Sequence, residues 1–238
     1  MSAVLPLARP VAPDHARVDT VVLLLGGLLL LCWDKLGWDR DVSRWFGDAS
    51  GFVWRDAWVA SSLLHQGGRV VAWCVVAVLI LHCWRPLQLI SVTQNRRQRI
   101  FMLVAVLLCI TFVPALKQFS STSCPWDLQE FGGAATYVSH WDALVHRMRD
   151  AGPGRCFPSG HAVAAFGFIP IYFALRRDAP QRARYVLWTI VVMGLLFGAA
   201  QLVRGAHYVS HTLWSAWLCW LLAVCLDRVL FSRARVPD

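Results

Sequence analysis

Residues 100–116 read IFMLVAVLLCITFVPAL, an uncharged apolar run that ends at Lys117. Such a run is typical of a helix that crosses a bilayer, which needs roughly 20 mostly apolar residues. Five other blocks are similar, although several are shorter and must extend into the residues that flank them. The six blocks are residues 18–33, 70–84, 100–116, 162–175, 185–203 and 212–226.

The composition favours the same class of protein. Of 238 residues, 57% are hydrophobic and 16% are charged. A soluble domain of this length would need more polar residues to cover its surface. We find no internal repeat and no soluble segment long enough to fold alone. The sequence therefore predicts an all-α polytopic membrane protein, one domain over residues 1–238 with six transmembrane helices in a bundle.

The connection between the first two blocks, residues 34–69, mixes charged and aromatic residues with apolar ones. It contains WDRD at 38–41 and WRD at 54–56. This pattern favours an amphipathic helix that lies on the extracytoplasmic membrane surface. A capping loop with no part in lipid access is the alternative.

The net charge of +9 could indicate a nucleic-acid partner, because basic chains bind phosphate backbones. Its distribution indicates a membrane topology instead, since the positive-inside rule places basic stretches in the cytoplasm. We expect a bacterial inner-membrane protein with both termini cytoplasmic, membrane lipids around it, and neither a nucleic acid nor an obligate protein partner. The basic stretches contain Arg9, Arg17, Arg85, Arg96, Arg97, Arg99, Arg176, Arg177, Arg182, Arg184, Arg228, Arg233 and Arg235.

A short motif, Pro158-Ser159-Gly160-His161, stands where an outer connection begins the fourth block. Proline favours the first turn of a helix, and glycine permits close approach of the backbone. The free N–H groups of such a helix start can face an anion, for which a phosphate is suitable. His161 would lie beside that anion and could donate a proton to a leaving oxygen.

A second motif spans residues 204–211 and reads RGAHYVSH. In a continuous helix, Arg204, His207 and His211 would lie on one face. If Gly205 ends the helix, only the two histidines keep that relationship. Lys117 emerges on the same predicted side of the membrane, and Lys35 is the only other lysine of the chain.

These motifs resemble the type 2 phosphatidic acid phosphatase superfamily of lipid phosphate phosphatases. The family pattern is a lysine, six residues and Arg-Pro, then Pro-Ser-Gly-His, then Ser-Arg, five residues, His, three residues and Asp. Residues 158–161 match the middle motif in full, and Lys117 begins the first motif. The first and third motifs diverge: Cys124 replaces an arginine, Gln201 replaces the second arginine, and His211 stands where the family has aspartate.

The resemblance implies a catalytic role for three histidines. His207 would attack phosphorus and become phosphorylated, His161 would protonate the leaving group, and His211 would orient His207. A rival register makes His211 the nucleophile and Ser215 its orienter. The other histidines, at positions 65, 82, 140 and 146, are expected to be structural.

The resemblance also implies the groups that hold the phosphate. Lys117, Ser159, Gly160 and Arg204 would bind its oxygens, with Arg204 one turn beyond the position of the family arginine. Arg155 and Arg147 are the nearest candidates to replace the arginine lost at Cys124. No metal and no cofactor are expected.

Two cysteines lie outside the apolar blocks, each beside one of these phosphate-binding elements. The topology places both Cys124 and Cys156 in the oxidising compartment, where a disulfide can form. We predict that they pair. The closed loop of about 30 residues would add a few kcal/mol of stability on chain-entropy grounds.

The sequence thus leads to a metal-independent phosphatase with a periplasmic active site. The candidate substrates are lipid A, undecaprenyl pyrophosphate and a glycerophospholipid phosphate such as phosphatidic acid. Two alternatives are a phosphotransferase that passes the phosphoryl group to another lipid, and a non-catalytic lipid carrier.

Overall fold

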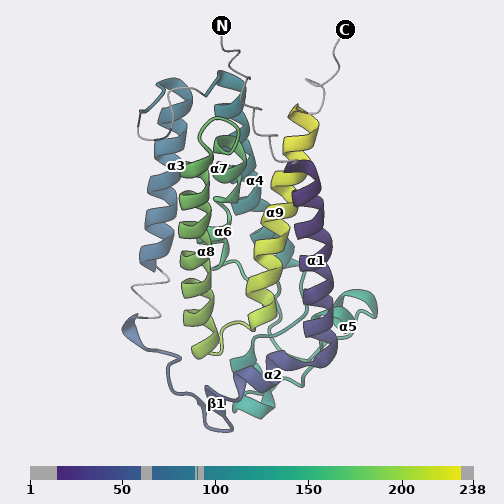
Figure 1. Ribbon diagram of the computed structural model, residues 1–238. Helices are drawn as coiled ribbons and strands as arrows, with labels where there is room; N and C mark the ends of the chain where they lie inside the picture. The colour runs from purple at the N-terminus through teal and green to yellow at the C-terminus, as the bar shows by residue number, and fades with distance from the viewer. Residues whose placement is uncertain (1–14, 60–65, 89, 91–93, 232–238) are drawn as a thin grey trace, which may run out of the picture.

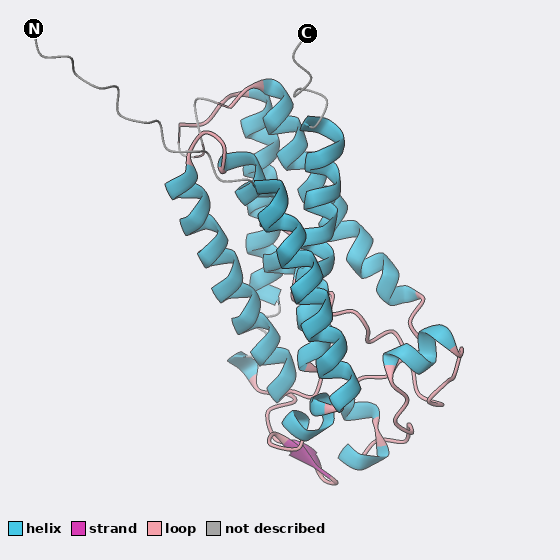
Figure 2. Cartoon of the chain, turned by 45° about the vertical axis from the view of Figure 1, so that its right-hand side comes forward, coloured by secondary structure: helices cyan, strands magenta, loops and turns pink. Residues whose placement is uncertain are grey.

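The computed structural model describes residues 15–59, 66–88, 90 and 94–231, which form a bundle of roughly parallel and antiparallel helices (Figure 1). Between the long helices lie short helices, two 3-10 turns and a two-stranded antiparallel hairpin (Figure 2). The long helices are α1 (His15–Leu36), α3 (Gly68–Trp84), α4 (Arg96–Gln118), α8 (Pro180–Val203) and α9 (Val209–Phe231). The shorter elements are α2 (Trp38–Ser43), β1 (Gly47–Asp48), β2 (Gly51–Phe52), η2 (Pro125–Asp127), η3 (Gln129–Phe131), α5 (His140–Val145), α6 (Val163–Phe166) and α7 (Ile169–Leu175).

Four of these helices, α1, α4, α8 and α9, are long and apolar enough to cross a membrane. Two shorter apolar segments accompany them, namely α3 and the consecutive helices α6 and α7 over Val163–Leu175. Each of the six apolar blocks of the sequence therefore lies within, or within one residue of, a helical segment. The structure supports a membrane-embedded helical protein, and a six-span topology remains a proposal.

The fourth apolar block is split into two helices rather than one. Pro170 has no N–H to donate to the carbonyl of Phe166, so a continuous helix would lose a hydrogen bond there. The chain turns at Gly167, where an added Cβ would lie 2.6 Å from the carbonyl oxygen of Val163. This break brings α6 against both α8 and α9.

Helix α4 forms the centre of the bundle and packs against α3, α7 and α9. Phe101, Ala105 and Cys109 recur at four-residue spacing and are all fully buried, as expected for one face of a helix. By contrast, α1 leaves its leucines outward, and Leu24 is 68% exposed. Such an apolar outer surface is stable only against lipid, which agrees with the membrane assignment.

The start of α1 and the end of α9 lie together at one end of the bundle. Arg228 donates to the hydroxyl of Thr20 at 2.6 Å. The basic connections between α3 and α4 and between α7 and α8 lie at the same end, because Gln98 donates to Asp178 at 2.6 Å. The connections that carry the motifs lie at the opposite end (Figure 1).

Helix α1 is joined to the rest of the bundle by buried polar contacts near both of its ends. Asp19 accepts two hydrogen bonds from Arg176, at 2.7 and 2.8 Å, and Arg176 also contacts Asp227 at 3.2 Å. At the other end, Asp34 accepts from the indole N–H of Trp214 at 2.8 Å. These contacts fix α1 against α7 and α9.

The connection after α1 differs from the expected surface helix. In its described part it contains α2, a helix of 6 residues, followed by the β1–β2 hairpin. Asp39 in α2 accepts hydrogen bonds from the backbone N–H and the hydroxyl of Ser210, at the start of α9. The segment thus binds the end of the bundle that carries the motifs, because its carboxylate satisfies an otherwise unpaired N–H of the helix start.

Candidate active site

Backbone hydrogen bonds join the three motif-bearing connections of the chain. The N–H of Arg155 donates to Ser120 at 2.7 Å, and that of Cys156 donates to Thr122 at 2.9 Å. The N–H of Trp126 donates to Gly205 at 3.0 Å. Segments whose bonded residues are up to 79 positions apart in the sequence therefore lie together at one end of the bundle.

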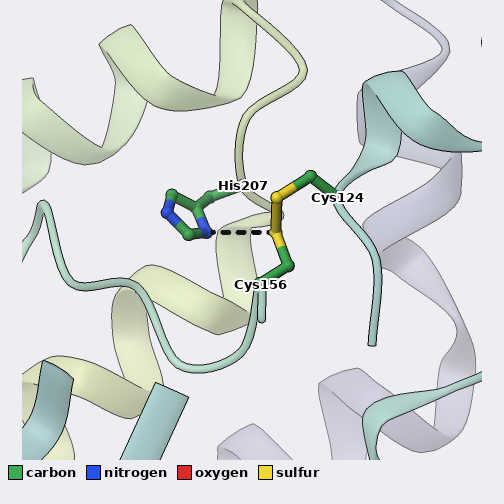
Figure 3. A group of neighbouring side chains, drawn as sticks. All are labelled: Cys124, Cys156 and His207. Atoms are coloured by element: carbon green, nitrogen blue, oxygen red, sulfur yellow. Dashed lines mark hydrogen bonds between the residues drawn. A yellow bond between two sulfur atoms is a disulfide. The ribbon is translucent and has the colours of Figure 1, made fainter. Parts of the chain in front are cut away.

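A disulfide joins Cys124 to Cys156, with the two Cα atoms 5.2 Å apart. It links the residue in the first motif's arginine position to Cys156, which lies two residues before the second motif. Figure 3 shows the imidazole of His207 against this bond, with Nδ1 3.5 Å from the Cys156 sulfur. A bonded sulfur has no proton, so at this contact it can only accept, and weakly.

His161 and His207 face each other at the centre of the site. Nδ1 of His161 lies 3.2 Å from Nε2 of His207, within hydrogen-bond distance. His161 precedes α6, and His207 lies in the turn between α8 and α9, where Gly205 adopts a φ of 71°. This left-handed conformation, which glycine adopts without strain, reverses the chain and turns His207 inward.

The surroundings of His207 keep its ring neutral. The side chain is only 1% exposed. Burial, followed by the nearby positive charge of His161, Lys117 and His211, holds the pKa of His207 well below its usual value. A neutral ring that carries its proton on Nδ1, towards the disulfide sulfur, would have its lone pair on Nε2, which is the form that a nucleophile requires.

A cavity of about 380 Å³ opens beside this pair, between α3, α4, α6 and α8. Its polar lining residues are Arg69, Lys117, Gln118, His161 and Gln201, and Gly160 lines it beside them. Lys117 lies close to the glycine, because an added Cβ at Gly160 would be 3.9 Å from its Cδ. The rest of the lining is mostly apolar and includes Ala72, Trp73, Val76, Ile110, Pro114, Val163, Ala164 and Phe197.

Ser159 is buried and its polar groups are used within the protein. Its backbone N–H donates to the carbonyl of His211 at 3.1 Å, and its hydroxyl accepts from the N–H of Ala162 at 3.4 Å. It is not among the residues that line the cavity. The structure therefore brings Lys117, Gly160 and His161 together at the cavity and gives Ser159 a supporting position behind them.

Arg204 also lies apart from the cavity. Its Nε donates to the carbonyl of Arg55 at 2.7 Å, and its guanidinium lies over the Trp126 ring, 5.7 Å from the centroid. One nitrogen contacts the side-chain oxygen of Gln201 at 3.4 Å. Gln201, in the position of the family arginine, lines the cavity itself.

His211 is fully buried behind the motif, and neither ring nitrogen has a hydrogen-bond partner among the described residues. Its ring centroid is 5.8 Å from that of His207. The expected orienting hydrogen bond to His207 is therefore not formed, and the Cys156 sulfur occupies the Nδ1 side instead. Ser215 donates to backbone carbonyls, those of Ser159 and His211.

Two residues near the site do not stand out in the sequence. Arg69, at the start of α3, lines the cavity. His140, expected to be merely structural, stacks on Phe157 with ring centroids 4.1 Å apart and contacts Asp34 at 3.2 Å. No local pattern identifies them, because both belong to segments that reach the site only through the tertiary fold. His65 lies outside the described residues.

One group of side chains in the described part of the chain has metal-ligand chemistry. It consists of Cys124, Cys156 and His207, whose potential ligand atoms lie within 4.8 Å of one another. The two sulfurs are bonded to each other, and a disulfide offers no thiolate to a metal.

An apolar helical bundle with two facing histidines and a lysine beside a cavity defines the class of this protein, a membrane-embedded helical protein with a polar site. The model of the PAP2 superfamily matches residues 99–235, more than half of the chain, and the chain therefore belongs to the PAP2 superfamily. This membership implies phosphatase activity on a phosphorylated lipid or a related substrate. No curated protein and no solved structure matches the chain significantly.

Proposed function

We propose that this protein hydrolyses a membrane lipid phosphate or pyrophosphate through a phosphohistidine formed on His207. The observation that carries the proposal is the 3.2 Å contact between Nε2 of His207 and Nδ1 of His161, beside a cavity that Lys117 lines. A nucleophile and a proton donor within hydrogen-bond reach are what two-step phosphoryl transfer requires.

In the first step, Nε2 of His207 attacks phosphorus, and the bond from phosphorus to the lipid oxygen breaks. His161 gives a proton to that oxygen. The leaving group is therefore an alcohol when the substrate is a monoester, and a lipid monophosphate when it is a pyrophosphate. In the second step, water attacks the phosphohistidine, His161 removes the water proton, and inorganic phosphate leaves. Lys117 and the Gly160 N–H stabilise the charge on the phosphate oxygens in both steps.

The phosphate needs a place between the two histidines. Because the rings are now in contact, His161 must withdraw from Nε2 when the phosphate binds. His161 also lines the cavity, whereas His207 lies behind it and is only 1% exposed. Substrate binding therefore uncovers the nucleophile, which limits the access of water before the lipid is in place.

The shape of the cavity supports a lipid substrate. Its polar end carries Lys117 and His161, and its apolar walls come from α3, α4, α6 and α8. Such a division suits a phosphorylated headgroup next to an acyl or prenyl chain. The apolar part lies along helices with the length or composition of membrane spans, so a lipid can reach the site from the side.

The disulfide and the charge pattern support a periplasmic site in a bacterial inner membrane. Disulfides persist in oxidising compartments, and Cys124–Cys156 lies at the catalytic end. The basic connections lie at the other end, where the positive-inside rule favours the cytoplasm. With six spans, both termini would be cytoplasmic.

The proposal is tested with purified protein in detergent and a panel of lipid phosphates and pyrophosphates, with a chelator present. We expect release of inorganic phosphate and a loss of at least about 10⁴-fold in the His207→Ala variant. In His161→Asn, a ³²P-labelled substrate should leave alkali-stable, acid-labile label on the protein. Equal activity of His207→Ala and the parent protein would refute the assignment.

The same assay separates the two alternatives. Transfer of the label to a second lipid without phosphate release would indicate a phosphotransferase. Lipid transport that survives in His207→Ala, with no turnover in the parent protein, would indicate a carrier.

A further inference from the structure

The site has fewer cations than its substrate requires. A phosphate monoester carries up to two negative charges, and charges are costly to transfer from water unless they are paired. Two cations are expected from the family motifs besides Lys117. The first motif's arginine is replaced by Cys124, and Arg204 donates hydrogen bonds to Arg55 and Gln201 outside the cavity. Lys117 alone, of the groups expected from the motifs, brings a permanent positive charge to the cavity lining.

Arg69 supplies a second cation to the same cavity. It is the second residue of α3 and lines the cavity together with Lys117, Gly160 and His161. Helix α3 packs against α4 and α6, which carry or follow these three residues. Arg69 therefore reaches the cavity from a helix that carries none of the motifs, and it precedes residues 99–235, which the family model covers.

The packing around Arg69 fixes its backbone. The neighbouring Gly68 is buried, and an added Cβ there would lie 2.9 Å from the ring of Phe197 in α8. This close approach holds the first turn of α3 against α8, and Phe197 lines the cavity as well. The position of the arginine is thus set by a helix contact rather than by a loop.

Neither Arg69 nor Lys117 forms an ion pair with a carboxylate in the part of the chain that the structure describes. Arg40 and Arg44, at the same end of the bundle, both bind Glu130 instead. Two cations without carboxylate partners on one cavity create a site for a doubly charged anion. A guanidinium adds a planar fork that binds two phosphate oxygens at once.

We propose that Arg69 is the second phosphate-binding cation, in the role of the guanidinium that is missing at Cys124, and that it binds the lipid phosphate together with Lys117. The inference rests on the proposed phosphatase function and extends it to a residue outside the family motifs. The Arg69 guanidinium would bind phosphate monoesters and diphosphates alike, because both present terminal phosphoryl oxygens to it.

The test compares Arg69→Ala, Arg69→Lys and the matched control Arg55→Ala in the phosphate-release assay. We expect Arg69→Ala to lower kcat/KM by about 100-fold, in the range for loss of one charged donor to the transition state. Arg69→Lys should recover part of that loss, since it keeps the charge without the fork. Arg55→Ala should stay within about threefold of the parent protein, since its side chain is exposed and lies outside the cavity.

A second measurement excludes a merely structural effect. Orthovanadate should inhibit the parent protein competitively, and Arg69→Ala should raise its inhibition constant by about tenfold or more while the unfolding temperature in detergent stays unchanged. An active parent protein, an inactive His207→Ala variant and a fully active Arg69→Ala variant would overturn this inference alone. A parent protein without any phosphatase activity would overturn the proposed function instead.

Discussion

At the scale of single residues, the proposed chemistry depends on two different sides of one imidazole. The Nε2 side of His207 faces His161, where we propose that the phosphate binds, and the Nδ1 side faces the Cys156 sulfur. The family aspartate would hold Nδ1 by a strong charged hydrogen bond. Here a weak acceptor replaces it, so neutrality of the ring depends more on burial than on a charged partner.

This arrangement predicts a pH profile with activity well into the acid range. The pKa of His207 is lowered, first by burial and then by its positive neighbours, so the ring stays deprotonated and nucleophilic below the usual histidine value of 6.5. We expect the acid limb of kcat/KM, which reports the protein without bound substrate and is measured from pH 4 to 8, to lie below pH 6.5. Lys117→Met should move this limb to higher pH, because it removes a cation that opposes protonation.

The stability of the folded protein changes with pH in the same sense. When folding lowers the pKa of a histidine, the residue contributes stability at pH values above its pKa in the unfolded chain. That stability is lost as the pH falls from the pKa of the unfolded chain toward the pKa of the folded protein. For the activity profile, an acid limb of kcat/KM at or above pH 6.5 in the parent protein would contradict a neutral, buried His207.

At the scale of elements, the catalytic end is made of loops that the disulfide and a few hydrogen bonds hold together. Asp150 accepts from the N–H and hydroxyl of Ser123, at 2.5 and 3.0 Å. Together with the Cys124–Cys156 bond, these contacts fix the loop after α4 against the segment before α6. The positions of Lys117 and His161 follow from that attachment.

Reduction of the disulfide should therefore weaken both the fold and the activity. A closed loop of this size contributes about 3–4 kcal/mol to the free energy of unfolding on the chain-entropy account. We expect a reductant to lower the unfolding temperature and to lower kcat by about tenfold, since His207 loses the fixed sulfur on its Nδ1 side.

The double variant Cys124→Ser/Cys156→Ser provides the control. It should show the lower stability and activity from the outset and should not respond further to the reductant. The free cysteines among the described residues are Cys32, Cys74, Cys83, Cys109, Cys219 and Cys225. An identical response of the double variant and the parent protein would show that these thiols, and not the disulfide, are responsible.

At the scale of the whole molecule, the end opposite the site is held by a buried ion cluster. Arg176 is 4% exposed and is shared by Asp19 from α1 and Asp227 from α9. Removal of one partner from such a cluster leaves uncompensated buried charge. The cluster is therefore a point at which one substitution affects three helices.

We expect Arg176→Met to lower the free energy of unfolding by roughly 3–5 kcal/mol, measured by thermal or denaturant unfolding in detergent. A second change, Asp19→Asn, should restore part of the loss, because it removes the carboxylate that has lost its partner. If Arg176→Met unfolds like the parent protein, the cluster contributes nothing to the attachment of α1.

Most of the helical fold could be predicted from local sequence. The apolar blocks lie in helices because a bilayer requires long apolar runs. The split of residues 162–175 at Gly167 was not predicted, and Pro114 within the unbroken α4 shows that a proline alone does not decide such a split. The hairpin at 47–52 and the short α2 in place of a surface helix were not predictable in this way. Their conformation depends on contacts with distant segments, such as that between Asp39 and Ser210.

The candidate site shows the same division. Lys117, Gly160 and His161 come from contiguous motifs, and the structure brings them to one cavity. The same motifs also contain Arg204, Ser159 and His211, but these residues do not line the cavity. Side-chain direction depends on neighbours that the motif does not contain, such as Arg55, whose carbonyl accepts from Arg204. Arg69 lies on another helix, and only the packing of α3 brings it to the cavity.

The attachment of α1 and α2 to α9 extends the working unit beyond the family domain. Both segments precede residue 99, yet Asp39 accepts from the first turn of α9 and Asp34 accepts from Trp214. A chain cut at the start of the family domain would leave the N–H of Ser210 and the indole N–H of Trp214 without these acceptors, and Arg176 with Asp227 alone. Because unpaired buried donors are costly, we expect such a fragment to be less stable than the full chain.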